Sequence, residues 1–125
     1  LASLIEREAR VGSERAKISR VIHNRLAANW FLGIDASIVY MTGNKELTLS
    51  DLQTESRYNT RLIKGLPPTP IAAAGRASLE AAMAPLPGQW MFYVLADKEG
   101  RHSFSVSSQE FERDKAKCQE QGLCG

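Results

Sequence analysis

Apolar residues recur every three or four positions in the first third of the chain, and this spacing predicts two amphipathic helices. The first covers residues 1–9, and Gly12 separates it from the second. Ser13 has a side chain suited to a helix N-cap, so we expect the second helix to start there and to end at about Asn29.

Three shorter helices are expected further along the chain. Residues 35–40 predict the first, although their β-branched run also suits a strand. Residues 47–53, with Ser50 as the cap, and residues 77–84 predict the other two. Residues 57–75, by contrast, are rich in glycine and proline, which forbid a continuous helix, so we expect a shaped loop there.

Strand propensity is concentrated in residues 90–95 and 102–106, which are separated by a turn at residues 97–100. This pattern predicts a β-hairpin. Ser107 and Glu110 have the spacing of a capping box, so a final helix is expected after the hairpin. The predicted fold class is therefore α+β, with several short helices packed with a small antiparallel β-hairpin sheet.

The composition fits one soluble globular domain: the chain has 125 residues, of which 43% are hydrophobic and 24% charged. No apolar run approaches the roughly 20 residues of a membrane span. A net charge of +2 is too small to indicate nucleic acid as a partner. Cys118 and Cys124 have no nearby pair of histidines, so no zinc site is expected, and a disulfide or two free thiols remain open.

Few side chains indicate chemistry on residue type alone. Glu6 and Glu8 lie in a short helix, where glutamates usually form a solvated charged face. Arg10 follows Glu6 by four positions, and an ion pair between them would lower the pKa of Glu6. Trp30, Trp90 and Tyr93 could stack on sugar rings, although core packing is commoner for such residues.

Seven short motifs follow one another along the chain. They are ASLIERE at 2–8, HNRL at 23–26, IDASIVY at 34–40, YNT at 58–60, GLPPTPI at 65–71, FYV at 92–94 and HSFS at 102–105. This series resembles the catalytic domain of the endolytic murein transglycosylases, the YceG/MltG-like family. The resemblance extends to about Phe111, and the tail over residues 112–125 matches no motif of the family.

The resemblance implies a lytic transglycosylase that needs no cofactor or metal. Such enzymes cleave the bond between N-acetylmuramic acid and N-acetylglucosamine within peptidoglycan strands and leave 1,6-anhydro-muramic ends. One glutamate serves as acid and then as base in this family, and Glu6 is the matching residue. An acid of this kind requires a raised pKa, which burial among apolar neighbours and the proline-rich loop would supply.

The resemblance also implies one substrate groove. Asn59 would hydrogen-bond an N-acetyl group or orient Glu6, and the loop over residues 65–71 would form one wall. Asp35 is equally compatible with a helix cap. The residues expected to bind substrate are Tyr58, Asn59, Thr60, Pro67, Pro68, Thr69, Asp35 and His102.

By the same resemblance, residues 1–125 form a single catalytic domain of a longer protein with an N-terminal membrane anchor and a small LysM-like domain. The expected location is the cell membrane, with the catalytic domain facing the cell wall. The expected partners are peptidoglycan glycan strands and cell-wall synthases (penicillin-binding proteins), and not nucleic acid. That extracytoplasmic setting favours a disulfide between Cys118 and Cys124, provided that the helix breaks between them at Gly122.

Two rival functions remain compatible with the same groove. One is a peptidoglycan-binding module without activity, and the other is a muramidase-type hydrolase that uses water.

Overall fold

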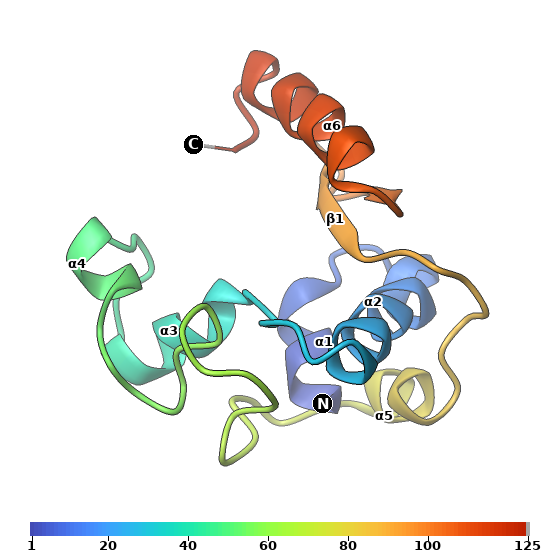
Figure 1. The fold of residues 1–125 in the computed structure, drawn as a ribbon. Coiled ribbons are helices and arrows are strands. Elements are labelled where there is room, and N and C mark those ends of the chain that lie inside the picture. The colour runs from blue at the N-terminus through green and yellow to red at the C-terminus, as the bar shows by residue number, and fades with distance from the viewer. Residues whose placement is uncertain (125) are drawn as a thin grey trace.

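Three helices form the body of the molecule in the computed structural model, which describes residues 1–124: α1 (Ala2–Glu8), α2 (Arg15–Ala27) and α5 (Arg76–Met83). The three helices lie side by side (Figure 1). They pack around a core of aliphatic side chains. The buried members of that core are Leu4, Ile5, Ile18, Ile22, Leu32, Ile34, Ile71 and Ala81. Ile5, Ile18 and Ile22 of this core lie in the two predicted amphipathic helices. The predicted α+β class is confirmed.

The N-terminal ends of two helices differ from expectation. A 3-10 turn, η1 (Gly12–Glu14), precedes α2, so Ser13 lies inside this turn and its predicted N-cap role is wrong. Helix α4 (Leu49–Leu52) is capped by Thr48 rather than Ser50. The Thr48 hydroxyl accepts from the Asp51 N–H while the Asp51 carboxylate accepts from the Thr48 N–H, and this reciprocal pair fixes the cap two residues earlier than expected.

The segment left open between helix and strand is a helix, α3 (Asp35–Thr42), which ends at Gly43 in the left-handed conformation. The proline-rich segment is a loop, as predicted, with no helix or strand between residues 57 and 75. It is tied to the body where the buried Ile71 N–H donates to the Ser3 hydroxyl at 3.1 Å.

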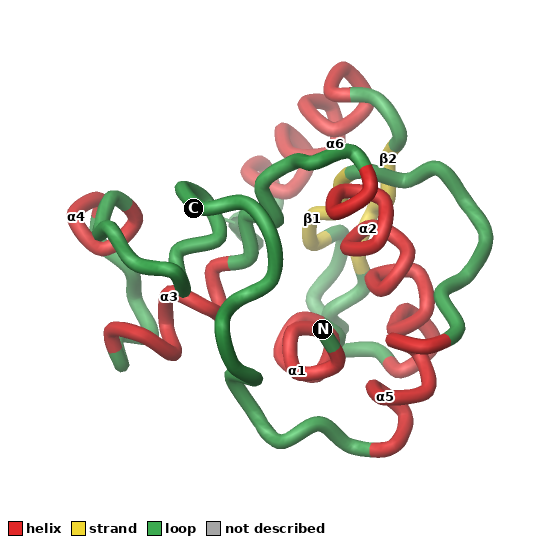
Figure 2. Tube along the Cα trace, turned by 60° about the horizontal axis from the view of Figure 1, so that its bottom comes forward, coloured by secondary structure: helices red, strands yellow, loops and turns green. Residues whose placement is uncertain are grey.

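Strands β1 (Phe92–Leu95) and β2 (His102–Ser105) form the predicted antiparallel hairpin, with Tyr93 opposite Phe104. Helix α6 (Ser108–Glu120) follows, capped by the Ser107 hydroxyl as expected. Figures 1 and 2 both show α6 packed on the hairpin at one end of the molecule. The hairpin and α6 together form an arm attached to the body, and we call this unit the hairpin–α6 arm.

The tail turns back after α6. Gly122 adopts a left-handed conformation, which breaks the helix as required, and Cys118 is disulfide-bonded to Cys124 with their Cα atoms 5.7 Å apart. Gly125, the last residue of the 112–125 tail, lies outside the described residues. No helix in residues 1–124 combines the length and apolar character needed to cross a bilayer.

Candidate active site

A cavity of about 400 Å³ lies between the body and the hairpin–α6 arm. The body contributes Arg7, Glu8, Arg10, Arg25, Leu32, Gly33 and Asp35, and the arm with its tail contributes Tyr93, Val94, Leu95, His102, Phe111 and Cys124. Two carboxylates, Glu8 and Asp35, thus share a space otherwise lined by cations, aromatic rings and aliphatic side chains.

Glu8 is the last residue of α1, and the Tyr93 hydroxyl donates to its Oε1 at 2.6 Å. Burial of the carboxyl group raises the pKa of Glu8, and this effect outweighs the Tyr93 hydrogen bond and the nearby His102, which both favour the carboxylate. Glu8 therefore holds a proton at higher pH than an ordinary glutamate, as a general acid must.

Tyr93 lies on β1 and is partly buried against the core. Burial, and then the charge of Glu8, raise the pKa of Tyr93 well above its ordinary value, so its hydroxyl remains a hydrogen-bond donor. The ring of His102 meets the Tyr93 ring edge-on, with centroids 5.3 Å apart. His102 lines the cavity as expected, and its Nδ1 lies 2.9 Å from the Glu14 Oε1, so Glu14 fixes the orientation of the imidazole.

Glu6 faces the other side of α1. Its Oε1 accepts from the Gly75 N–H and the Ser78 hydroxyl, both at 2.9 Å, and it does not line the cavity. These two hydrogen bonds, first that of Gly75, lower the pKa of Glu6, whereas we expected it to be raised. The predicted pairing with Arg10 is absent from the described residues, because α1 ends at Glu8 and the chain then becomes extended.

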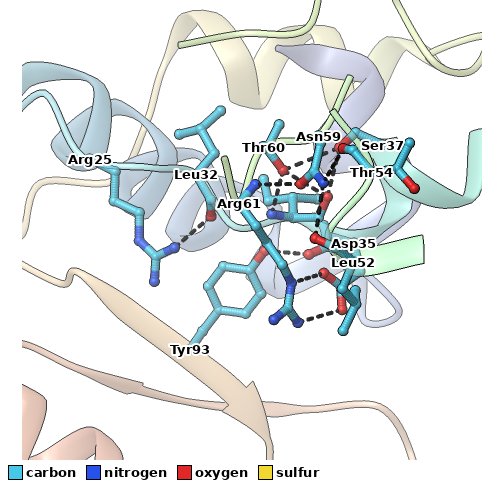
Figure 3. Close-up of polar contacts among 12 residues, drawn as sticks. Arg25, Leu32, Asp35, Ser37, Leu52, Thr54, Asn59, Thr60, Arg61 and Tyr93 are labelled. Carbon is cyan, nitrogen blue, oxygen red and sulfur yellow. Dashed lines mark hydrogen bonds and ion pairs between the residues drawn. The ribbon is translucent and has the colours of Figure 1, made fainter. Parts of the chain in front are cut away.

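Asp35 begins α3, and its carboxylate accepts two hydrogen bonds from Arg61, at 2.7 Å to Nε and 2.9 Å to Nη2. Figure 3 shows this pair beside Tyr93. The N-cap of α3 is Ile34, so the helix-cap alternative for Asp35 is wrong. Asp35 faces the cavity as expected, with Arg61 as a partner that the sequence did not indicate.

Asn59 and Thr60 are buried and serve the backbone instead of the cavity (Figure 3). The Asn59 amide donates to the carbonyl groups of Leu52 and Thr54, at 3.0 and 2.8 Å. The Thr60 hydroxyl accepts from the Ile34 N–H at 2.8 Å. Both side chains hold the start of α3 and the end of α4 in place, and neither lines the cavity.

The proline-rich loop also lies outside this cavity. Tyr58 bonds through its hydroxyl to the Thr69 hydroxyl at 2.7 Å and packs on Tyr40, with ring centroids 5.4 Å apart. Pro67 and Pro68 do not line the cavity either. The walls come from the body and the hairpin–α6 arm, and the expected wall over residues 65–71 is not among them.

Three residues whose contacts in the cavity the sequence did not indicate lie in the seven motifs, whereas Arg61 lies outside them. Glu8 is in ASLIERE, Arg25 in HNRL and Tyr93 in FYV. Arg25 donates to the carbonyl groups of Met91 and Leu32, so it joins α2 to the beginning of β1. The sequence signal that could have found them is their place inside the motifs that carry the family resemblance.

Comparison with known proteins gives a consistent result. Residues 1–117 match the model of the YceG-like family. An endolytic murein transglycosylase of Bacillus subtilis (strain 168) is 40% identical over 119 residues, which are 94% of this chain and 33% of that protein. One of Streptococcus pneumoniae is 24% identical over 123 residues, which are 93% of this chain and 22% of that protein.

A crystal structure of a yceG-like protein from Listeria monocytogenes superimposes with a TM-score of 0.84 at 35% identity, covering 90% of this chain and 37% of that one. The chain therefore spans about a third of the length of this structure and of the Bacillus relative, and less of the Streptococcus one.

Proposed function

Because this chain belongs to the YceG-like family, we propose that it is the catalytic unit of an endolytic murein transglycosylase acting on peptidoglycan glycan strands. One observation carries the proposal: Glu8 has a carboxyl group of raised pKa in the wall of a cavity, with a phenol donating to it. We assign the acid to Glu8 rather than Glu6, since a carboxylate stabilised as an anion by two donors is poorly suited to giving up a proton.

The first chemical step is protonation of a poor leaving group. The oxygen between N-acetylmuramic acid and N-acetylglucosamine departs only if it gains a proton as the bond breaks. Protonated Glu8 supplies that proton and becomes a carboxylate. The Tyr93 hydroxyl then stabilises the new charge through the hydrogen bond already in place.

The second step returns the proton. The muramic C6 hydroxyl attacks C1 of its own ring, and the Glu8 carboxylate accepts the hydroxyl proton, so the enzyme ends as it began and the product is a 1,6-anhydro sugar. Because the nucleophile belongs to the same ring, its effective concentration is far above that of a loosely held water.

A hydrolase is the second candidate, since Asp35 shares the cavity with Glu8. Retaining glycosidases use a second carboxylate as nucleophile. Both oxygens of Asp35 accept from Arg61, and this bidentate ion pair stabilises the carboxylate as an anion and so weakens it as a nucleophile. This arrangement favours the transglycosylase.

Digestion of purified peptidoglycan in heavy-oxygen water decides between these functions. We expect new muramic ends without label and lighter by one water, about 18 Da from covalent arithmetic, than hydrolytic ends. Stoichiometric label at those ends would assign a hydrolase. Glu8→Gln serves as the inactive control, and failure of the unsubstituted protein to release any soluble fragment would leave only a binding module.

The cellular setting belongs to the same proposal. We propose action at the cell wall by a longer, membrane-anchored protein that works with peptidoglycan synthases. The names of the relatives support the substrate, and the anchor and the synthase partners stay predictions.

A further inference from the structure

Two consecutive aromatic residues, Trp30 and Phe31, lie on the surface with 43% and 44% of their area exposed. The residues that precede and follow them in the chain fix their position. Asn29, in the left-handed conformation, ends α2 in a Schellman motif in which the Trp30 N–H donates to the Arg25 carbonyl at 2.9 Å. Leu32 follows directly and is buried in the core. The two rings are therefore held outward by rigid backbone.

These rings border a second cavity of about 410 Å³, lined by Arg25, Asn29, Trp30, Phe31, Lys64 and Phe92. Trp30 and Phe92 lie with ring centroids 5.8 Å apart, and the Arg25 guanidinium lies 5.5 Å from the Phe92 ring centre. Arg25 also lines the cavity that holds Glu8, so the two spaces are neighbours that share one side chain.

Lys64 supplies a positive charge at the edge of this second cavity. The Lys64 ammonium lies 5.3 Å from the Phe31 ring centre. Lys64 belongs to the proline-rich loop, whereas Arg25, which lines the same cavity, belongs to α2. Exposed aromatic faces beside a few polar groups are typical of sites that bind a flat, partly apolar ligand. A sugar ring has such a face of C–H groups, and peptides attached to muramic acid carry carboxylates that suit Lys64.

We propose that the second cavity is an additional glycan subsite, in which a sugar ring of the strand stacks on Trp30 and Phe31 while Lys64 contacts a carboxylate of an attached peptide. This inference rests on the proposed function for its substrate, and it extends the binding surface beyond the bond that is cleaved. A strand long enough to occupy both cavities would be held at two points, which favours cleavage within strands over cleavage of short fragments.

Fluorescence of Trp30 tests the contact without relying on catalysis. Trp90→Phe removes the other tryptophan, and Glu8→Gln prevents turnover. Uncross-linked glycan strands should then shift the emission of Trp30. Calorimetric titration should show that Trp30→Ala with Phe31→Ala weakens strand binding roughly tenfold. An unchanged spectrum at saturation, or equal affinity in the double variant, would overturn the subsite. If Glu8→Gln still cleaves strands while Trp30 responds, the acid assignment fails and the subsite stands.

Steady-state kinetics and a variant that removes the Lys64 charge provide a second test. In the otherwise unsubstituted protein, the Trp30/Phe31 double variant should raise KM for long strands and leave kcat and the rate on short fragments unchanged. Leu79→Ala is the control, because Leu79 is similarly exposed, at 49%, but lines neither cavity. Lys64→Gln should weaken binding of strands with peptides and not of strands stripped of them, and an equal loss on both would refute the carboxylate contact.

Discussion

Helix α1 presents two glutamates to two different environments. Glu6 and Glu8 are two positions apart, and at about 100° of rotation per residue their side chains leave the helix on nearly opposite sides. Glu6 meets donors at the beginning of α5, and its pKa is lowered. Glu8 meets β1, and its pKa is raised. One short motif therefore contains an anion that ties two helices together and an acid suited to proton transfer.

The difference between Glu6 and Glu8 predicts that substituting them has its largest effect on turnover. Glu8→Gln should lower kcat by roughly 10²–10⁴-fold, because the amide has no proton to give to the leaving oxygen. Glu6→Gln, the matched control on the same helix, should keep kcat within a few-fold of the parent. Release of soluble fragments from peptidoglycan measures both, and the reverse outcome would return the acid to Glu6.

The ionised side chains of Glu6 and Glu8 should contribute to the free energy of unfolding with opposite signs. The pKa of Glu6 in the folded state lies below its reference value of 4.5, so its contribution to folding is present above that pH and lost as pH falls through the folded-state pKa. The pKa of Glu8 lies above 4.5, so its carboxylate favours unfolding as pH rises.

Thermal melts should show these opposite signs. At pH 7 we expect Glu6→Gln to lower Tm and Glu8→Gln to raise it, and each difference should shrink as pH falls through the folded-state pKa of that glutamate, below which glutamate and glutamine are alike in charge. Equal shifts in the two variants would contradict the environments described for α1.

The smallest effect concerns the phenol that faces Glu8. Tyr93→Phe removes the hydrogen bond that favours the carboxylate, so the pKa of Glu8 should rise further and the alkaline limb of the kcat/KM profile should move to higher pH. The loss at the optimum should be about threefold to tenfold, as expected for one hydrogen bond. A lower rate with an unmoved profile would show that Tyr93 only supports packing.

Local signals explain what the sequence could predict. The hairpin, the Ser107 cap and the break at Gly122 depend on neighbouring residues, and all three are present. The cap of α4 was misplaced because Thr48 and Ser50 are both good caps, and only the reciprocal contact with Asp51 favours the former.

The choice between the two glutamates could not be made locally. Both stand in the same helix with the same propensity, and their environments come from Ser78 and Tyr93, far along the chain. The YNT motif shows a related limit. Asn59 and Thr60 were expected to contact substrate, but their polar atoms serve backbone groups, so a recognisable motif here marks a folding requirement.

The separation between Glu8 and Tyr93, 85 positions along the chain, also has a consequence for biosynthesis. Closing so long a loop is slow, and contacts of this kind form late in folding. During synthesis Glu8 leaves the ribosome long before β1 does. Until the hairpin docks, the Glu8 carboxyl group stays hydrated and its pKa stays near the ordinary value for glutamate. Docking of the hairpin is therefore the step that raises the pKa of Glu8.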